Sequence, residues 1–350
     1  MPEKEYVSAI LKEINLWNRE TDSSDVGTVY FGGGTPSLIS PKGISNILSE
    51  LSKKFKLKNP EITIEANPGT VDMESLRGYK NAGINRISIG IQSINDRLLS
   101  SLGRTHSSKD ALSAFESART AGFNNIGIDL IHSIGGESSQ DWKDDLKDAV
   151  SLHPEHISAY NLTIEEGTPF HHSQEKGLLL LPSEDEQTDM LLETIEVLCT
   201  AGYEHYEVSN YALPGFRSRH NQVYWKGGEY LGIGVSAHSY IRKGWGIRRT
   251  NSSNLTEYFN LINKKGTAVV DEEILSNREA MGEVVFLGLR MMEGINVKDF
   301  ENRFGIKIEE AYSGAIDELT TEDFLIYADD YLKLTRKGLL FYNDVALRFI

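Results

Sequence analysis

Residues 29–36 read VYFGGGTP, a short apolar run that leads directly into Gly32, Gly33 and Gly34. The run is aromatic and β-branched and too short for a helix, so it predicts a β-strand. Because glycine has no Cβ, the backbone after this strand is open to close approach by a polar ligand. The spacing matches neither a Walker loop nor a dinucleotide fingerprint. Taken alone, the stretch fits a ligand-binding loop and an empty tight turn equally well.

Outward from this stretch, expected helices alternate with expected strands. Apolar residues at helical spacing occur before it and after it, from Val7 to Trp17 and from Ile44 to Leu51. Further strands are expected at residues 61–66, 86–92, 124–131 and 156–164, with a helix between each pair. This alternation predicts an α/β fold with a parallel sheet, open or closed into a barrel, that binds ligands at the carboxyl ends of its strands.

The pattern divides the chain into three expected parts. Residues 1–180 form a partial (β/α) barrel, and residues 181–270 form a barrel extension with accessory strands, including one strand over HYEVSN at 205–210. Residues 271–350 form a small winged-helix-like domain, with helices followed by a hairpin that turns at residues 328–330. The chain begins on a helix that the first strand of such a barrel normally precedes, so we expect that strand to be missing upstream.

Composition limits the classes of partner and compartment. The net charge of −15 and the lack of any stretch rich in Lys and Arg disfavour nucleic acid and anionic membranes as partners. No signal peptide or membrane-spanning run is present, so we expect a cytoplasmic protein. The single cysteine, Cys199, excludes an internal disulfide and a metal cage built from cysteines alone. It lies in the apolar run LLETIEVLC, so a buried, inert thiol is expected there.

Polar residues occur at or shortly after the expected strand ends. Glu65, Gln92 and Asp129 each end a strand, and Arg104 follows a short helix. A carboxylate can hold an ammonium, the Arg104 fork can hold a carboxylate, and Gln92 or Asp129 can hold ribose hydroxyls. An amino-acid nucleoside such as S-adenosylmethionine presents all these groups. Each residue taken alone fits a surface salt bridge or a helix cap better.

The nine histidines separate into two groups. We expect His171 and His172 to be solvated in a polar loop, and His153 and His156 to cap a helix end. His220 opens the segment HNQVYW, and His238 lies in a glycine-rich strand. Both fit an aromatic pocket for a flat ligand such as a porphyrin, with imidazole as axial ligand, and both also fit hydrogen-bonded core histidines.

With these residues identified, the chain closely resembles the HemW heme-chaperone family. Its members are relatives of the oxygen-independent coproporphyrinogen III oxidases, within the radical S-adenosylmethionine superfamily. The resemblance runs over nearly the whole chain and rests on VYFGGGTPSLIS, EANPGT, GINRISIGIQS, LGRTH, IDLI, ISAYNLTIEEGTPF, YEVSNYA, HNQVYW and LGIGVSAH. It implies a partial barrel of the radical S-adenosylmethionine type, and it implies cofactor contacts at Gly33, Gly34, Thr35, Glu65, Gln92, Arg104 and Asp129. The oxidase branch lacks the His-Asn-x-x-Tyr-Trp motif, which makes His220 the candidate heme contact.

The chain departs from the family pattern in two places. Ser133-Ile134-Gly135 replaces the family's Gly-Leu-Pro, which reshapes a loop but leaves the cofactor set intact. The CxxxCxxC motif that holds a [4Fe-4S] cluster is absent, and Cys199 cannot replace it. The family places this motif and the first barrel strand just before the helix that opens this chain. We therefore expect an N-terminally truncated form, with true loss of the motif as the alternative. The protein then binds the cluster only if a missing segment supplies the cysteines.

Three functions follow from the resemblance and the residues. The first is a heme-binding chaperone that delivers heme to membrane-bound respiratory enzymes. The second is oxidative decarboxylation of coproporphyrinogen III to protoporphyrinogen IX in a full-length, cluster-bearing protein. The third is a cluster-free remnant that only binds another protein. The family motif HNQVYW favours the first.

Overall fold

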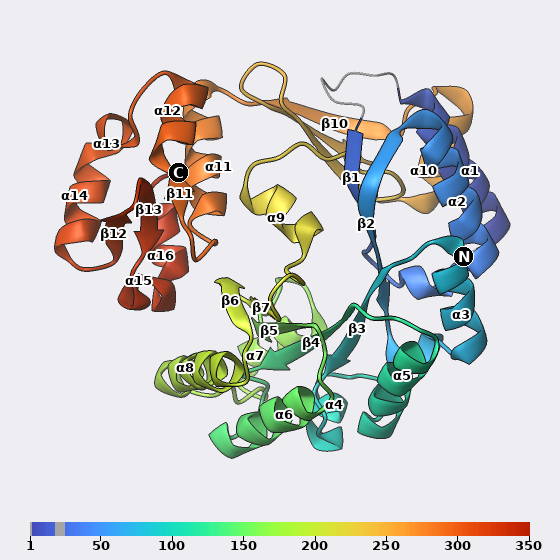
Figure 1. The fold of residues 1–350 in the computed structure, drawn as a ribbon, viewed down its shortest axis with the longest axis horizontal. Helices are drawn as coiled ribbons and strands as arrows, with labels where there is room; N and C mark the ends of the chain where they lie inside the picture. The colour runs from blue at the N-terminus through green and yellow to red at the C-terminus, as the bar shows by residue number, and fades with distance from the viewer. Residues whose placement is uncertain (1, 18–24) are drawn as a thin grey trace. The chain divides into compact units, whose positions relative to one another are not determined.

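The computed structural model describes residues 2–17 and 25–350, and these form two compact units (Figure 1). Unit 1 contains Met1–Val29, Lys42–Pro60 and Arg219–Ile350, and unit 2 contains Tyr30–Pro41 and Glu61–Ser218. The three-part division expected from the sequence stays a prediction.

A seven-stranded sheet has the order β1-β2-β3-β4-β5-β7-β6, and unit 2 contains all of it except the residues of β1 up to Val29 and those of β2 up to Pro60. The predicted parallel sheet is confirmed, because β2 through β5 pair in parallel in sequence order. One detail of the prediction is wrong: HYEVSN is an antiparallel hairpin of β6 and β7 rather than one strand. The Glu207 carboxylate accepts the Ser209 N–H at 3.0 Å, which stabilises the turn. The strands are β1 (Asp25–Phe31), β2 (Lys56–Ala66), β3 (Arg86–Gln92), β4 (Ile126–His132), β5 (His156–Asn161), β6 (Glu204–Glu207) and β7 (Asn210–Ala212).

Helices follow the strands of unit 2 and begin at strong caps. Capping boxes at Asp72, Ser107, Ser138 and Ser183 fix the starts of four of them. Figure 1 shows α3, α5, α6 and α8 along one side of the strands. The helices of this unit are α3 (Met73–Ala82), α4 (Asp96–Ser101), α5 (Ser108–Thr120), α6 (Ser139–Ser151), α7 (Pro169–Glu175) and α8 (Glu184–Thr200).

The two faces of this sheet differ in polarity. Side chains alternate between faces along a strand, so the fully buried isoleucines at 64, 87, 89, 128 and 157 belong to one face. The other face carries polar residues, and the register pairs Glu65 with Ser88 and Asp129 with Ser158. Parallel sheets usually bury apolar residues on both faces. The polar face is therefore an exception, and the candidate residues belong to it.

Unit 1 combines N-terminal helices, a small antiparallel sheet and the C-terminal helices. Its second three-stranded sheet, β11-β13-β12, contains the predicted hairpin, which turns at Asp329 and Asp330 with φ of 51° and 65°. The elements up to the first sheet are α1 (Glu3–Leu16), α2 (Pro41–Lys54), α9 (Arg219–Trp225), β8 (His238–Ile241), β9 (Ile247–Asn251), α10 (Leu255–Lys264) and β10 (Val269–Ile274). The rest are α11 (Asn277–Gly288), β11 (Ile295–Asn296), α12 (Val297–Phe304), α13 (Ile308–Ala311), α14 (Ser313–Thr321), β12 (Leu325–Ala328), β13 (Tyr331–Leu334), α15 (Arg336–Leu340) and α16 (Tyr342–Leu347).

Helix α8 contains the only cysteine of the sequence, at its surface. Cys199 is exposed on α8, so the expected buried thiol is wrong. The apolar run around it is amphipathic, and Leu198 rather than Cys199 faces the core. Across the described residues, none of the helices combines the length and apolar character that a membrane-spanning segment needs.

A buried carboxylate holds the N-terminal part of unit 1 together. Glu13 of α1 is 4% exposed and accepts hydrogen bonds from three donors in different segments. These are the Tyr258 Oη at 2.7 Å, the Gly234 N–H at 2.8 Å and the Asn251 Nδ2 at 2.6 Å. Burial raises the pKa of Glu13 above its usual value, against the effect of these donors.

We expect Glu13→Ala to lower the free energy of unfolding of unit 1 by about 3 kcal/mol, because it leaves three donors without their acceptor. The measurement is urea denaturation followed by circular dichroism. Glu5→Ala, on the exposed side of the same helix, is the matched control and should change stability by about 0.5 kcal/mol or less. Equal effects of the two substitutions would contradict the role given to Glu13.

Candidate functional site

The glycine loop after β1 is open for two separate physical reasons. A Cβ at Gly32 would lie 2.5 Å from the Tyr30 ring, so that position requires glycine for packing. Gly33 and Gly34 have φ of 75° and 44°, which disfavours other residues, and a Cβ at either would meet nothing within 4 Å. The backbone at Gly33 and Gly34 is thus accessible to a ligand.

Glu65 of β2 fixes this loop. Its Oε1 accepts the Tyr30 phenol at 2.7 Å, and its Oε2 accepts the Gly33 N–H at 3.1 Å. Burial raises the pKa of Tyr30, and the charges of Glu65 and Asp129 raise it further. Tyr30 therefore stays a neutral donor to Glu65. Thr35, later in the loop, lies 3.4 Å from the Asn67 amide.

Asp129 lies deeper in the polar face than the sequence suggested. It is inside β4 rather than at its end, and the Ser88 hydroxyl lies 3.2 Å and 3.3 Å from its two oxygens. Burial and the nearby Glu65 charge raise the pKa of Asp129 to about 6, while hydrogen bonds from Ser158 and Ser88 and the Arg86 charge oppose this shift. Asp129 is thus a carboxylate that changes protonation state just below neutral pH.

Gln92 ends β3 in a left-handed conformation, with φ of 71°. Its amide folds back over Gly90, where a Cβ would lie 2.8 Å from the amide nitrogen. Arg104 is exposed in the loop between α4 and α5, and no hydrogen bond or ion pair among the described residues joins it to the other candidates. The structure therefore groups Gly33, Glu65 and Asp129 through Tyr30 and Ser88, whereas Arg104 has no such link.

Sequence reasoning missed several members of this polar face. Tyr30, Ser88, Ser158 and Arg86 contact the predicted residues or shift their pKa values. Strand alternation could have found them, since Ser88 and Arg86 precede Gln92 by four and six residues in the same strand. His156 was expected to cap a helix, and this is wrong. It is buried in β5, where its Nε2 lies 2.8 Å from the Tyr206 Oη.

In unit 1, HNQVYW forms most of the short helix α9. Both ring nitrogens of His220 have partners, since Nδ1 lies 2.9 Å from the Thr28 Oγ1 and Nε2 lies 2.9 Å from the Tyr224 Oη. The Arg290 guanidinium lies over the Trp225 ring, 4.3 Å from its centroid. His238 begins β8, is exposed, and has its Nδ1 3.1 Å from the Thr250 Oγ1.

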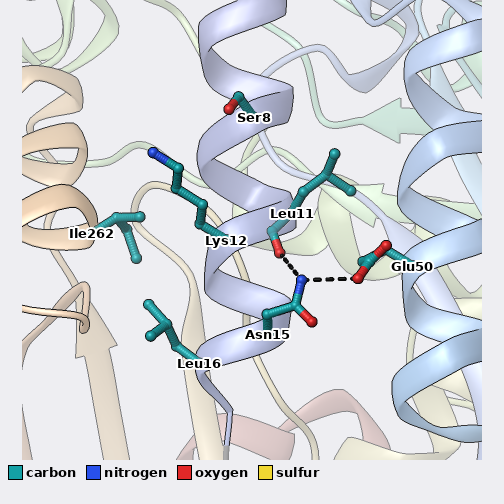
Figure 2. Close-up of a pocket in the computed structure, with 7 residues that line it drawn as sticks. All are labelled: Ser8, Leu11, Lys12, Asn15, Leu16, Glu50 and Ile262. Carbon is teal, nitrogen blue, oxygen red and sulfur yellow. Dashed lines mark hydrogen bonds between the residues drawn. The ribbon is translucent and has the colours of Figure 1, made fainter.

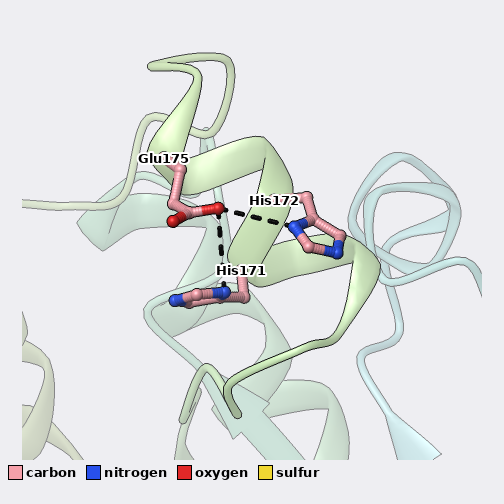
Figure 3. Close-up of side chains that lie close together, drawn as sticks. All are labelled: His171, His172 and Glu175. Carbon is pink, nitrogen blue, oxygen red and sulfur yellow. Dashed lines mark hydrogen bonds and ion pairs between the residues drawn. The ribbon is translucent and has the colours of Figure 1, made fainter.

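Two other features contain none of the predicted site residues. A pocket of about 440 Å³ is formed by residues of α1, α2 and α10, and it is lined by Ser8, Leu11, Lys12, Asn15, Leu16, Glu50 and Ile262 (Figure 2). His171, His172 and Glu175 form an open cluster on unit 2, in which the two Nδ1 atoms lie 3.9 Å and 3.4 Å from the Glu175 Oε2 (Figure 3). The expected loop there is wrong, because both histidines belong to helix α7, which Thr168 caps.

The residues present do not fit an iron–sulfur cluster. Such a cluster is held by several cysteine thiolates, and this sequence contains one cysteine, on the surface of α8.

The pKa of Asp129 gives a test of the polar face. The Asp129 carboxyl has a higher pKa in the folded protein than in the unfolded chain, so its ionisation destabilises the fold. The free energy of unfolding of the wild type should therefore fall as pH rises from about 4 to above 6. We expect Asp129→Asn to gain about 2 kcal/mol of stability relative to wild type between pH 4 and pH 7. Urea unfolding of both chains across this range measures the difference, and a difference independent of pH would contradict the shifted pKa.

Comparison with known proteins gives the family. The family model of the Radical SAM superfamily matches residues 4–149, and the family model of the HemN C-terminal domain matches residues 275–341. The solved structure of coproporphyrinogen III oxidase (HemN) from Escherichia coli covers 99% of this chain and 83% of its own, with a TM-score of 0.81. At 22% identity this likeness shows the fold, and it confirms the expected radical S-adenosylmethionine type of partial barrel.

Relatives with higher identity match almost end to end. The heme chaperone HemW of Lactococcus lactis is 36% identical over 346 residues, which are 99% of this chain and 89% of that protein. The heme chaperone HemW of Bacillus subtilis is 32% identical over 351 residues, which are 100% of this chain and 92% of that protein. The heme chaperone HemW of Escherichia coli is 32% identical over 352 residues, with 100% and 91% covered. The chain therefore belongs to the HemW heme-chaperone family of the radical SAM superfamily.

Proposed function

We propose that this chain is a cytoplasmic heme-binding chaperone that passes heme to membrane-bound respiratory enzymes. The observation that carries the proposal is the near end-to-end match to relatives named as heme chaperones, at 32% to 36% identity. The motif HNQVYW supports the chaperone over the oxidase branch of the superfamily. The likeness to the oxidase structure, at 22% identity, concerns the fold alone.

For heme, we assign His220 as a contact on unit 1. Its ring is held edge to face with Tyr224, with ring centroids 5.0 Å apart, and Tyr224 is in turn edge to face with Tyr230 at 4.6 Å. Aromatic rings of this kind suit a flat apolar macrocycle. Both ring nitrogens of His220 have hydroxyl partners, and these partners fix the orientation of the ring beside the aromatic group.

For S-adenosylmethionine, we propose a separate site on unit 2. The open backbone at Gly33, Gly34 and Thr35 receives the methionyl end, and Glu65 supplies a carboxylate beside it. Gln92 and Asp129 form hydrogen bonds with the ribose hydroxyls, and Arg104 pairs with the carboxylate of the ligand. The accessible loop supports this assignment, because the backbone of two adjacent left-handed glycines is unobstructed there.

A bound [4Fe-4S] cluster would supply electrons for cleavage of S-adenosylmethionine. Since this sequence does not provide its three thiolates, no step is assigned through it. The proposed role is to carry heme, and this role does not depend on the proposed S-adenosylmethionine site on unit 2.

We expect the purified chain to bind hemin and to show a Soret band shifted from that of free hemin. His220→Ala should raise the dissociation constant about tenfold, equivalent to about 1.4 kcal/mol, because the aromatic group loses its hydrogen-bonded anchor. Spectrophotometric titration measures both. His106→Ala is the control, because His106 is a partly buried histidine of unit 2 whose Nε2 lies 3.1 Å from the Ile91 carbonyl oxygen. A wild-type chain that leaves the hemin spectrum unchanged would exclude the proposed function.

We expect Gly33→Ala to weaken binding of S-adenosylmethionine at least about tenfold in calorimetric titration. The added methyl group enters the space given to the ligand and strains a backbone with φ of 75°. Gly202→Ala is the matched control, since Gly202 has φ of 90°, equally free surroundings and a place after α8. Comparable loss of affinity in both variants would assign the effect to folding rather than to the site.

A further inference from the structure

We propose that His171, His172 and Glu175 of helix α7 bind one divalent transition-metal ion, for which Zn²⁺ is the test ion. The site lies on unit 2 and contains none of the residues proposed for heme or S-adenosylmethionine, so it goes beyond the proposed function and does not depend on it. The three side chains bring their ligand atoms to within 4.8 Å of one another. Two imidazole nitrogens and one carboxylate oxygen are a donor set that zinc accepts.

The helix places these side chains next to one another. Thr168 caps it, because its hydroxyl accepts the His171 N–H at 3.2 Å, and Pro169 lies in the first turn. Glu175 follows His171 by four residues and His172 by three, and both spacings make side chains neighbours on a helix. Figure 3 shows the result, in which both imidazoles face the same carboxylate oxygen.

The separations between the donor atoms suit a single small ion. The Glu175 Oε2 lies 3.4 Å from the His172 Nδ1 and 3.9 Å from the His171 Nδ1. Zinc binds nitrogen and oxygen at about 2.0–2.2 Å, so two donors in tetrahedral positions lie about 3.3–3.6 Å apart. One pair already has this separation, and the other needs a shift of a few tenths of an ångström. The side chains of His172 and Glu175 are both 61% exposed, so they can make this shift without repacking the interior.

Both imidazoles can present a lone pair at Nδ1. The Gly167 N–H donates to the His171 Nδ1 at 3.4 Å, so this nitrogen is the unprotonated one. The His172 Nδ1 lies 3.4 Å from the Glu175 carboxylate, and since a carboxylate only accepts, this nitrogen carries the proton between them. A metal ion takes the place of that proton, which moves to the Nε2 of the exposed ring. Both Nδ1 atoms can therefore bind the same ion.

The donor set and its surroundings favour a particular class of cation. Glu165 and Glu166 precede the helix and are exposed, and Lys176 is the basic residue that follows it. Imidazole suits Zn²⁺, Cu²⁺ and Ni²⁺, whereas Mg²⁺ and Ca²⁺ prefer sites made of oxygen. Three protein donors leave the fourth tetrahedral position to water. An ion that joins residues one turn apart also stabilises α7, whose seven residues are too few for a helix that is stable alone.

The test is calorimetric titration of the tag-free full chain with Zn²⁺, in a Cys199→Ser background that removes the exposed thiol. We expect this reference chain to bind one ion, and we expect His172→Ala and Glu175→Gln each to raise the dissociation constant at least about tenfold. Mg²⁺ should not bind comparably. Bound Zn²⁺ should also slow hydrogen exchange of the amides of residues 169–175, because it joins the two ends of the helix.

Gln174→Ala is the matched control, because Gln174 is exposed on the same helix and is not part of the cluster. It should bind Zn²⁺ as the reference chain does. A reference chain that binds no Zn²⁺, unchanged affinity in His172→Ala and Glu175→Gln, or equal losses in Gln174→Ala and His172→Ala would overturn the proposal. His172→Ala should bind hemin as the wild type does, so failure of this metal site and failure of the proposed function give different results.

Discussion

The polar half of unit 2 depends on one carboxylate, that of Glu65. Its two oxygens hold the Tyr30 phenol and the Gly33 N–H, and so they connect β2 with the end of β1 and with the glycine loop. The left-handed backbone at Gly33 and Gly34 cannot continue a strand ladder. A side-chain acceptor therefore has to fix the loop, and its charge also contributes to the raised pKa values of Tyr30 and Asp129.

This arrangement has an energetic cost that packing alone does not explain. Arg86 is 2% exposed, and its Nε, the buried Thr63 hydroxyl and the His156 Nδ1 have no hydrogen-bond partner among the residues that the structure describes. Unsatisfied polar groups in a protein interior typically cost about 1–3 kcal/mol each. The opposite face of the same strands is lined by fully buried isoleucines, which supply the stability that the polar face lacks. Such a division is typical of a sheet that binds polar ligands on one side and packs helices on the other.

Histidines in this chain show how a single residue type takes different roles through its hydrogen bonds. His156 is buried against Tyr206, and burial lowers its pKa well below the usual value, so it stays neutral. His220 is fixed at both nitrogens, and His238 at one. The number of histidines and their distance in the sequence from aromatic residues do not distinguish these three roles.

The sequence by itself determined the order and type of most elements. The alternation of apolar runs predicted the parallel strands β2 to β5 and the helices between them, and the motifs placed Glu65 and Gln92 near the ends of their strands. These features depend on neighbours a few residues away, so local patterns reveal them. Tertiary structure alone decided that HYEVSN folds into a hairpin, that Cys199 faces solvent and that His156 is buried. It also decided which atoms of Glu65, Asp129, His220 and His238 are already occupied, because those partners come from segments far apart in the chain.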